Sequence, residues 1–251
     1  MRTTVAVAKR LGFKSSILLR TPTGQKPSPE NYDGNLFFTH LLADNVRFCS
    51  AEEYKNRATL MEEMQKQISS NASDQKAYII PEGGSNATGM WGYISMMKEL
   101  HSENRKFTTI VVPVGSGGTI AGVLAGKALL KMDVHVIGIA VCDSAAFFRA
   151  EVDKLFKEFN EKFSTSLQPG SYDLYEDYIG DGYAQTYELE LQLVKTIIQS
   201  QGIFLDLSYG GKAMVGITDL IIKRKFKPTD SILFVHTGGI WSLFAEKKQL
   251  V

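Results

Sequence analysis

The segment with the clearest chemical potential runs from Val111 to Gly122, where an apolar stretch ends in Gly-Ser-Gly-Gly-Thr. A strand that ends in glycines and continues into a helix leaves backbone N–H groups unpaired at the positive end of the helix dipole. Such a turn is a phosphate cradle, to which the hydroxyls of Ser116 and Thr119 can add donors. The pattern therefore predicts a phosphate site, with a tight turn that holds no ligand as the alternative. The residues concerned are Gly115, Ser116, Gly117, Gly118 and Thr119.

The same segment excludes two common phosphate ligands. It is not a Walker loop, because no Gly-Lys-Ser/Thr follows the glycines. It also lacks a clean dinucleotide fingerprint, because Ile120 stands where the third glycine belongs. The phosphate would therefore belong to something other than a nucleoside triphosphate or an ordinary NAD.

Two further glycine-rich segments carry polar side chains. The run His236-Thr237-Gly238-Gly239 follows an apolar stretch, and ligands in open α/β sheets lie beyond the C-terminal ends of strands. His236 alone is more often a core or turn histidine than an acid–base group. Tyr183 and Tyr209 each lie beside glycines, and an exposed ring can stack on a planar ligand. Without more context, packing is the alternative for both tyrosines.

The elements that must position these residues alternate along the chain. Short apolar runs predict strands, and periodic stretches predict helices between them. Because the strands are apolar on both faces, the pattern favours an α/β architecture with largely parallel sheets covered on both sides. We expect a small α/β domain over residues 1–86 and a large ligand-binding domain over 87–251. The expected strands are 16–19, 46–49, 77–80, 109–114, 134–141, 203–205 and 231–235. The expected helices are 2–12, 36–42, 51–69, 88–100, 120–130, 187–200 and 212–223, and residues 144–170 are expected to be helical and then loop.

Composition narrows the classes of partner. Lys plus Arg number 28 and Asp plus Glu 27, so nothing favours nucleic acid or an anionic membrane surface. No apolar run reaches the roughly 20 residues of a membrane helix. The two cysteines, Cys49 and Cys142, lie far apart, which favours core thiols in a reducing compartment. We expect a cytoplasmic protein without a metal site; the basic N-terminus leaves a mitochondrial or plastid transit peptide as an alternative.

Four segments in this order resemble one enzyme family. The chain is similar to D-cysteine desulfhydrases and 1-aminocyclopropane-1-carboxylate deaminases, which are pyridoxal-phosphate enzymes of the tryptophan-synthase-β-like fold with two domains of open parallel sheet. The glycine run at 115–119 is shared by many enzymes of that fold, whereas its combination with His236-Thr237-Gly238-Gly239 is more specific. The similar segments are 80–86, 115–122, 209–213 and 234–239.

The resemblance implies a role for each candidate residue. Gly115 to Thr119 would hold the phosphate of pyridoxal 5'-phosphate, and Thr237 would hydrogen-bond the pyridine nitrogen. Tyr209 would lie against the ring or near the substrate, and Tyr183 would line the substrate side. The substrate would be a small amino acid, and the implied reaction converts D-cysteine to pyruvate, ammonia and hydrogen sulfide. Family members are commonly homodimers, so the resemblance also implies a homodimer.

Two departures from the family are expected to matter. Before Tyr209 the chain has Asp206-Leu207-Ser208, where the family usually has Asp-Pro-Val. The family's Schiff-base lysine and its Ser-Asn-His turn precede everything in this chain, so both are expected to be absent, as is the N-terminal part of the large domain. Lys127 and Lys212 are poor replacements, because a reacting amine must be positioned and unprotonated.

Three readings of function follow. The first is a D-cysteine desulfhydrase-like lyase, favoured over the deaminase because Thr237 stands where the deaminase is expected to use an acidic residue. The second is 1-aminocyclopropane-1-carboxylate deaminase itself. The third is a catalytically inactive truncated isoform or pseudoenzyme, because the Schiff-base lysine is absent. An unrelated phosphate-binding module has only the isolated glycine loop in its favour.

Overall fold

The computed structural model describes residues 1–71, 76–103 and 105–250. The chain forms two compact units, Met1–Pro81 and Glu82–Val251. Each contains a parallel sheet with helices, which confirms the predicted α/β class. None of the helices among the described residues is both long and apolar enough to cross a membrane.

The first unit is built around a two-stranded parallel sheet. Strand β1 pairs with β2 in a register that places Leu18 opposite Arg47. Leu18, Cys49 and Met64 form its small buried cluster, which is the burial expected for Cys49. The elements are α1 (Arg2–Arg10), β1 (Ser16–Arg20), η1 (Pro29–Asn31), α2 (Gly34–Leu42), β2 (Asn45–Cys49), η2 (Glu53–Asn56) and α3 (Arg57–Asn71).

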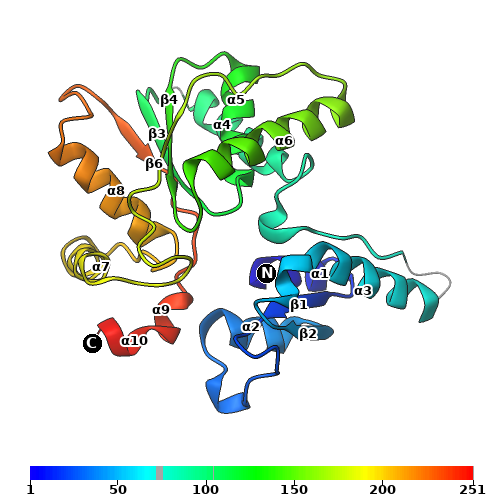
Figure 1. Cartoon of the computed structure of the whole chain (residues 1–251). Coiled ribbons are helices and arrows are strands. Elements are labelled where there is room, and N and C mark those ends of the chain that lie inside the picture. The colour runs from blue at the N-terminus through cyan, green and yellow to red at the C-terminus, as the bar shows by residue number, and fades with distance from the viewer. Residues whose placement is uncertain (72–75, 104, 251) are drawn as a thin grey trace. The chain divides into compact units, whose positions relative to one another are not determined.

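The second unit contains a four-stranded parallel sheet in the order β5-β4-β3-β6. Helices α4, α5 and α6 cover one face of this sheet and α7 and α8 the other (Figure 1). The elements are η3 (Glu82–Gly84), α4 (Met90–Ser102), β3 (Thr109–Val114), α5 (Gly118–Leu130), β4 (His135–Ala140), α6 (Ala145–Phe163), β5 (Asp173–Tyr175), α7 (Glu188–Gln201), α8 (Gly210–Ile222), β6 (Ile232–Phe234), α9 (Ser242–Ala245) and α10 (Lys247–Leu250).

Strand β3 is the centre of the second unit, and all six of its residues are buried. Its alternating side chains enter two clusters: Ile110 and Val112 pack with α4 and α5, whereas Val111 packs with α8. A run of β-branched residues without polar alternation suits a strand covered on both faces. The sheet therefore holds the ends of its strands in fixed relation to one another.

Pro113 explains why β6 leaves the sheet early. The pairing of β3 with β6 ends at Val111, whose carbonyl accepts from the N–H of Val235. Two residues further on, Pro113 has no N–H to offer on that side of the strand. The chain after Val235 is therefore free to turn away, which makes room for the segment that contains Thr237.

Two predicted strands are wrong. Residues 77–80 and 203–205 form no strand, and Tyr78 and Phe204 are exposed. Both runs are apolar, but no neighbouring strand pairs with their backbone, and an apolar run without a pairing partner does not make a strand. Conversely, β5 was not predicted, because its three residues, Asp173 to Tyr175, show no apolar alternation.

Residues 82–86 belong to the second unit and pack against its glycine loop. The Ser85 hydroxyl donates to Ser116 Oγ at 2.8 Å and accepts from the N–H of Gly118 at 3.2 Å. The sequence predicts a domain boundary after residue 86, whereas the two compact units meet between Pro81 and Glu82. The assignment of a small domain and a cofactor-binding domain remains a proposal.

Candidate active site

The C-terminal edge of the four-stranded sheet brings the predicted site residues into one region. The glycine loop follows β3, and Thr237 lies beyond the end of the neighbouring β6. Tyr183 lies in the connection that follows β5. Since these strands are parallel, all three segments leave the same edge of the sheet, where ligands bind in open α/β folds.

The glycine loop has the geometry of an anion site. Gly117 caps α5 in the left-handed conformation, at φ +81°, which a side chain adopts only with strain. Gly117 and Gly118 are buried, and a Cβ atom on Gly118 would lie 2.5 Å from Ser85 Oγ. Helix α5 therefore begins at a backbone-lined turn that only glycine can form, with the positive end of its dipole at the loop.

Tyr209 and Tyr183 form a pair beside this loop. The Tyr209 hydroxyl donates to that of Tyr183 at 3.0 Å, and the two rings meet edge to face with centroids 5.8 Å apart. The Tyr209 ring lies so close to Gly115 that a Cβ atom there would be 2.6 Å from Cε1. Burial raises the pKa of both tyrosines, so both hydroxyls are protonated at neutral pH. Tyr209 is the donor of the pair, and Tyr183 is the acceptor.

Asp206 fixes the backbone around Tyr209. Its carboxylate is 1% exposed and accepts the N–H groups of Ser208, Tyr209 and Gly210 at 3.0, 2.9 and 2.8 Å. These N–H groups are the orphan donors at the start of α8, so Asp206 acts as their cap. Gly239 packs against the same carboxylate, since a Cβ atom on Gly239 would lie 2.8 Å from Cγ. Asp206 thus links the Tyr209 turn to the segment that contains Thr237.

His236 is a turn residue, which was the more common of the two interpretations of a lone histidine. Its Nδ1 accepts the N–H of Gly238 at 3.0 Å, so its Nε2 carries the proton that is donated to the Phe204 carbonyl at 2.7 Å. With both nitrogens bound to backbone groups, His236 shapes the turn. Thr237 is exposed, and within the described residues its hydroxyl has no hydrogen-bond partner. That hydroxyl is free for a ligand.

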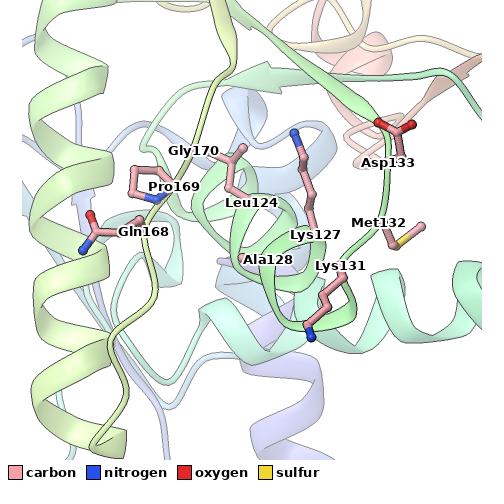
Figure 2. A pocket seen from close by; sticks show the side chains of 9 residues that line it. All are labelled: Leu124, Lys127, Ala128, Lys131, Met132, Asp133, Gln168, Pro169 and Gly170. Atoms are coloured by element: carbon pink, nitrogen blue, oxygen red, sulfur yellow. The ribbon is translucent and has the colours of Figure 1, made fainter.

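Lys212 and Lys127 lie in different surroundings. Lys212 is fully buried, and its ammonium donates to the backbone carbonyls of Ile179, Gly182 and Val141. Lys127 lines an open pocket formed by the last turns of α5 and residues 168–170 (Figure 2). That pocket lies at the opposite end of α5 from the glycine loop, a separation of roughly 20 Å for a helix of 13 residues. The pocket contains no predicted site residue.

Cys142 lies close to the loop as a protonated thiol. Its thiol donates to the Gly115 carbonyl at 3.5 Å, and burial raises its pKa to about 11. The thiolate is therefore scarce at neutral pH. Cys142 and Cys49 are both free thiols.

Sequence reasoning missed the residues that hold the site together. It named Asp206 only as part of a departure from the family and gave Ser85 no role. An Asp a few residues before a helix is a recognisable capping signal, so Asp206 could have been found. No comparable signal marks the contact of Ser85 with Gly118, because 33 residues separate them. Glu190, buried next to Gly211, was also missed.

The fold and this edge define a class of protein: a parallel α/β fold with a phosphate cradle at a helix start, a free hydroxyl just beyond the neighbouring strand and protonated tyrosines beside the cradle. These groups fit pyridoxal 5'-phosphate, which needs an anion site, a partner for its ring nitrogen and space bounded by side chains. The fit rests on the left-handed glycine turn at Gly117 and on the free Thr237 hydroxyl.

Comparisons with known proteins point to the same class of enzyme. The family model described as "Pyridoxal-phosphate dependent enzyme" matches residues 2–238. D-cysteine desulfhydrase of Klebsiella pneumoniae is 35% identical over 98% of this chain and 74% of its own length. A putative 1-aminocyclopropane-1-carboxylate deaminase of Thermotoga maritima is 33% identical over 100% of this chain and 77% of its own length. The crystal structure of an ACC deaminase homologue superposes with a TM-score of 0.86 at 31% identity, covering 98% of this chain and 72% of that one.

The chain belongs to the pyridoxal-phosphate dependent enzymes, within the group that contains D-cysteine desulfhydrases and 1-aminocyclopropane-1-carboxylate deaminases. Its family's cofactor is pyridoxal 5'-phosphate, as predicted. The predicted two-sheet pyridoxal-phosphate fold is confirmed by the same match and by the superposition.

Proposed function

We propose that this protein is a pyridoxal-phosphate-dependent lyase that cleaves D-cysteine, with one water, into pyruvate, ammonia and hydrogen sulfide. One observation carries the proposal: the glycine loop at the start of α5 lies directly beside the paired hydroxyls of Tyr209 and Tyr183. A phosphate cradle next to two protonated tyrosines provides a cofactor site and a substrate site in one place. The names of the relatives support the choice of reaction.

The cofactor would be held by three groups. Residues 115–119 would bind its phosphate through backbone N–H groups and through the hydroxyls of Ser116 and Thr119. The free Thr237 hydroxyl would hydrogen-bond the ring nitrogen. When bound, the cofactor supplies an electron-withdrawing ring that stabilises negative charge at the substrate's α-carbon.

The two tyrosines would act on the substrate side. Tyr209 lies against Gly115, so its ring would form one wall of the space next to the cofactor. Its protonated hydroxyl is a donor, and its neighbour Tyr183 can take up that hydrogen bond or turn to a substrate group. Such donors can give a proton to a departing thiolate, which is how the sulfur leaves as hydrogen sulfide.

Thr237 favours elimination over reactions in which negative charge at the substrate's α-carbon must be strongly stabilised. A carboxylate beside the ring nitrogen would keep the pyridine protonated, and a hydroxyl stabilises that form less. A site with a threonine therefore suits loss of a good β-leaving group, where negative charge at the α-carbon is relieved at once by departure of the sulfur.

A second candidate reaction is the deamination of 1-aminocyclopropane-1-carboxylate, in which the ring opens and a four-carbon 2-oxo acid and ammonia are released. The Thermotoga maritima relative and the superposed structure carry that name. A third candidate is a chain that binds cofactor without turning over. Its basis is the clamped state of Lys212, whose amine is committed to backbone carbonyls.

One experiment separates the three candidates. The purified chain is loaded with pyridoxal 5'-phosphate, and release of hydrogen sulfide from D-cysteine is measured alongside release of a 2-oxo acid from 1-aminocyclopropane-1-carboxylate. Hydrogen sulfide without ring opening supports the proposal, and ring opening alone supports the deaminase. Cofactor binding without either product supports the non-catalytic chain. Borohydride reduction and peptide mapping then identify any lysine bound to the cofactor.

We further propose that the protein is a homodimer, as the family resemblance implies, and that it is cytoplasmic, as its two separate free cysteines favour. Light scattering coupled to size-exclusion chromatography tests the dimer, because a monomer has a mass of 27.8 kDa. Fractionation of cells tests the location.

A further inference from the structure

Lys212 is an unusual buried cation. It lies in the first turn of α8, three residues after Tyr209, and is 0% exposed. Its Nζ atom donates to the carbonyls of Gly182 at 2.5 Å, Ile179 at 2.6 Å and Val141 at 3.4 Å. An ammonium group has three N–H donors, and three backbone carbonyls take them. No carboxylate in the described chain makes an ion pair with it.

Two of these carbonyls belong to the connection that leads from β5 to Tyr183. This connection has positive φ angles at Gly180, Gly182 and Ala184, and alanine rarely adopts that conformation. A backbone in such a state persists only where its surroundings hold it. The ammonium of Lys212 supplies that restraint at Gly182, the residue directly before Tyr183.

The first turn of α8 therefore holds both members of the tyrosine pair. Asp206 fixes the backbone of Tyr209 from one side, as described above. Lys212 fixes the residue before Tyr183 from the other side. Between these two restraints, the two hydroxyls meet at 3.0 Å.

We propose that Lys212 is a positioning residue for the active site: its ammonium clamps residues 179–182 so that the Tyr183 hydroxyl meets Tyr209. The clamp explains why a lysine is buried here with its three donors on backbone carbonyls, although the Glu190 carboxylate lies nearby. It also makes Lys212 unavailable as the amine that reacts with the cofactor. The consequence for catalysis rests on the proposed function, since only there do Tyr183 and Tyr209 face a substrate.

The test follows the tyrosine pair directly. The full chain is labelled with 3-fluorotyrosine, and the ¹⁹F signals of its ten tyrosines are recorded. Tyr209→Phe and Tyr183→Phe assign two of them. Tyr183→Phe also gives the position that the Tyr209 signal takes when its hydroxyl partner is gone. Lys212→Met keeps the length and apolar stem of the side chain but removes the ammonium.

In Lys212→Met, we expect the Tyr209 signal to move to the position that it has in Tyr183→Phe, while the signals of distant tyrosines stay in place. Lys195→Met, an exposed lysine on the neighbouring α7, is the matched control and should leave the Tyr209 signal where the wild type has it. A wild-type Tyr209 signal in Lys212→Met would overturn the proposal. So would an even change over all ten signals, because Lys212 would then be a general stability residue.

If Lys212→Met does not fold, Lys212→Gln takes its place, because glutamine retains two N–H donors without the charge. The Tyr209 signal should then move part of the way, and a wild-type position would again overturn the clamp. None of these measurements needs cofactor or substrate. A failure of the proposed function would appear as absent turnover with the ¹⁹F result intact, so the two failures are distinguishable.

Discussion

The hydroxyl of Tyr209 donates to the hydroxyl of Tyr183 at 3.0 Å, across 26 positions of sequence. The pair joins the start of α8 to the connection after β5, and the Tyr209 ring packs on the glycine loop. The contact therefore connects the segment that would hold phosphate with the segment that would line the substrate. Its geometry gives the first prediction.

Tyr209→Phe should remove this hydrogen bond without opening the packing on Gly115. The free energy of unfolding should fall by about 1 kcal/mol, the net value of one such bond. In the cofactor-loaded protein the same change should reduce release of hydrogen sulfide, because the donor on the substrate side is lost. Urea unfolding measures the first effect, and Tyr78→Phe, at an exposed tyrosine of the first unit, is the control. Unchanged turnover would contradict the substrate-side role.

Asp206→Asn should destabilise the protein more than Tyr209→Phe. In asparagine, an NH₂ group replaces one carboxylate oxygen and cannot accept a hydrogen bond, so at least one N–H group at the start of α8 is left buried without a partner. We expect a loss of about 2 kcal/mol in the free energy of unfolding. Asp153→Asn, on an exposed face of α6, should cost little. Equal losses in the two variants would show that Asp206 is no special cap.

Glu190 predicts a pH dependence of stability. It is 0% exposed, and burial raises its pKa from an ordinary value of 4.5 to about 8, although the nearby ammonium of Lys212 opposes that rise. Between these values the folded protein keeps a proton that the unfolded chain has lost. Stability therefore falls as pH rises from 4.5 towards 8.

Glu190→Gln removes this titration. The variant should lose the decline in melting temperature across that window and should be more stable than the wild type above pH 8. Glu188→Gln, an exposed neighbour on α7, should keep the wild-type profile. Thermal unfolding between pH 5 and pH 9 checks both. A parallel decline in wild type and Glu190→Gln would contradict the raised pKa.

Much of the fold could be predicted because its signals are local. The run Thr109–Val114 is buried throughout, and a strand that is covered on both faces lacks the alternation of polar and apolar residues. The glycine turn after it is a local motif, so the phosphate cradle could also be predicted from the sequence. The expected strand at 77–80 failed because pairing depends on neighbours that an apolar run does not reveal.

The arrangement of the site residues in space was harder to predict from the sequence. Nothing local brings Tyr183 to Tyr209, because their meeting depends on how α8 packs against the sheet and on the backbone carbonyls that Lys212 binds. Carbonyl positions carry no sequence signal. His236 illustrates the converse, since both of its nitrogens bind nearby backbone groups, and a turn role is the common outcome for such a residue.

The central claim is that the loop at the start of α5 binds the phosphate of pyridoxal 5'-phosphate. Equilibrium dialysis of this cofactor against the wild type, Gly117→Asp and Gly202→Asp tests it most directly. Gly202 has φ +68° and caps α7 far from the loop in sequence, so its variant places the same charge on another left-handed glycine.

Gly117→Asp should weaken cofactor binding by at least about tenfold, or about 1.4 kcal/mol, because its carboxylate repels the phosphate in a buried turn. Gly202→Asp should bind like the wild type. Equal affinity in Gly117→Asp and the wild type would contradict the account.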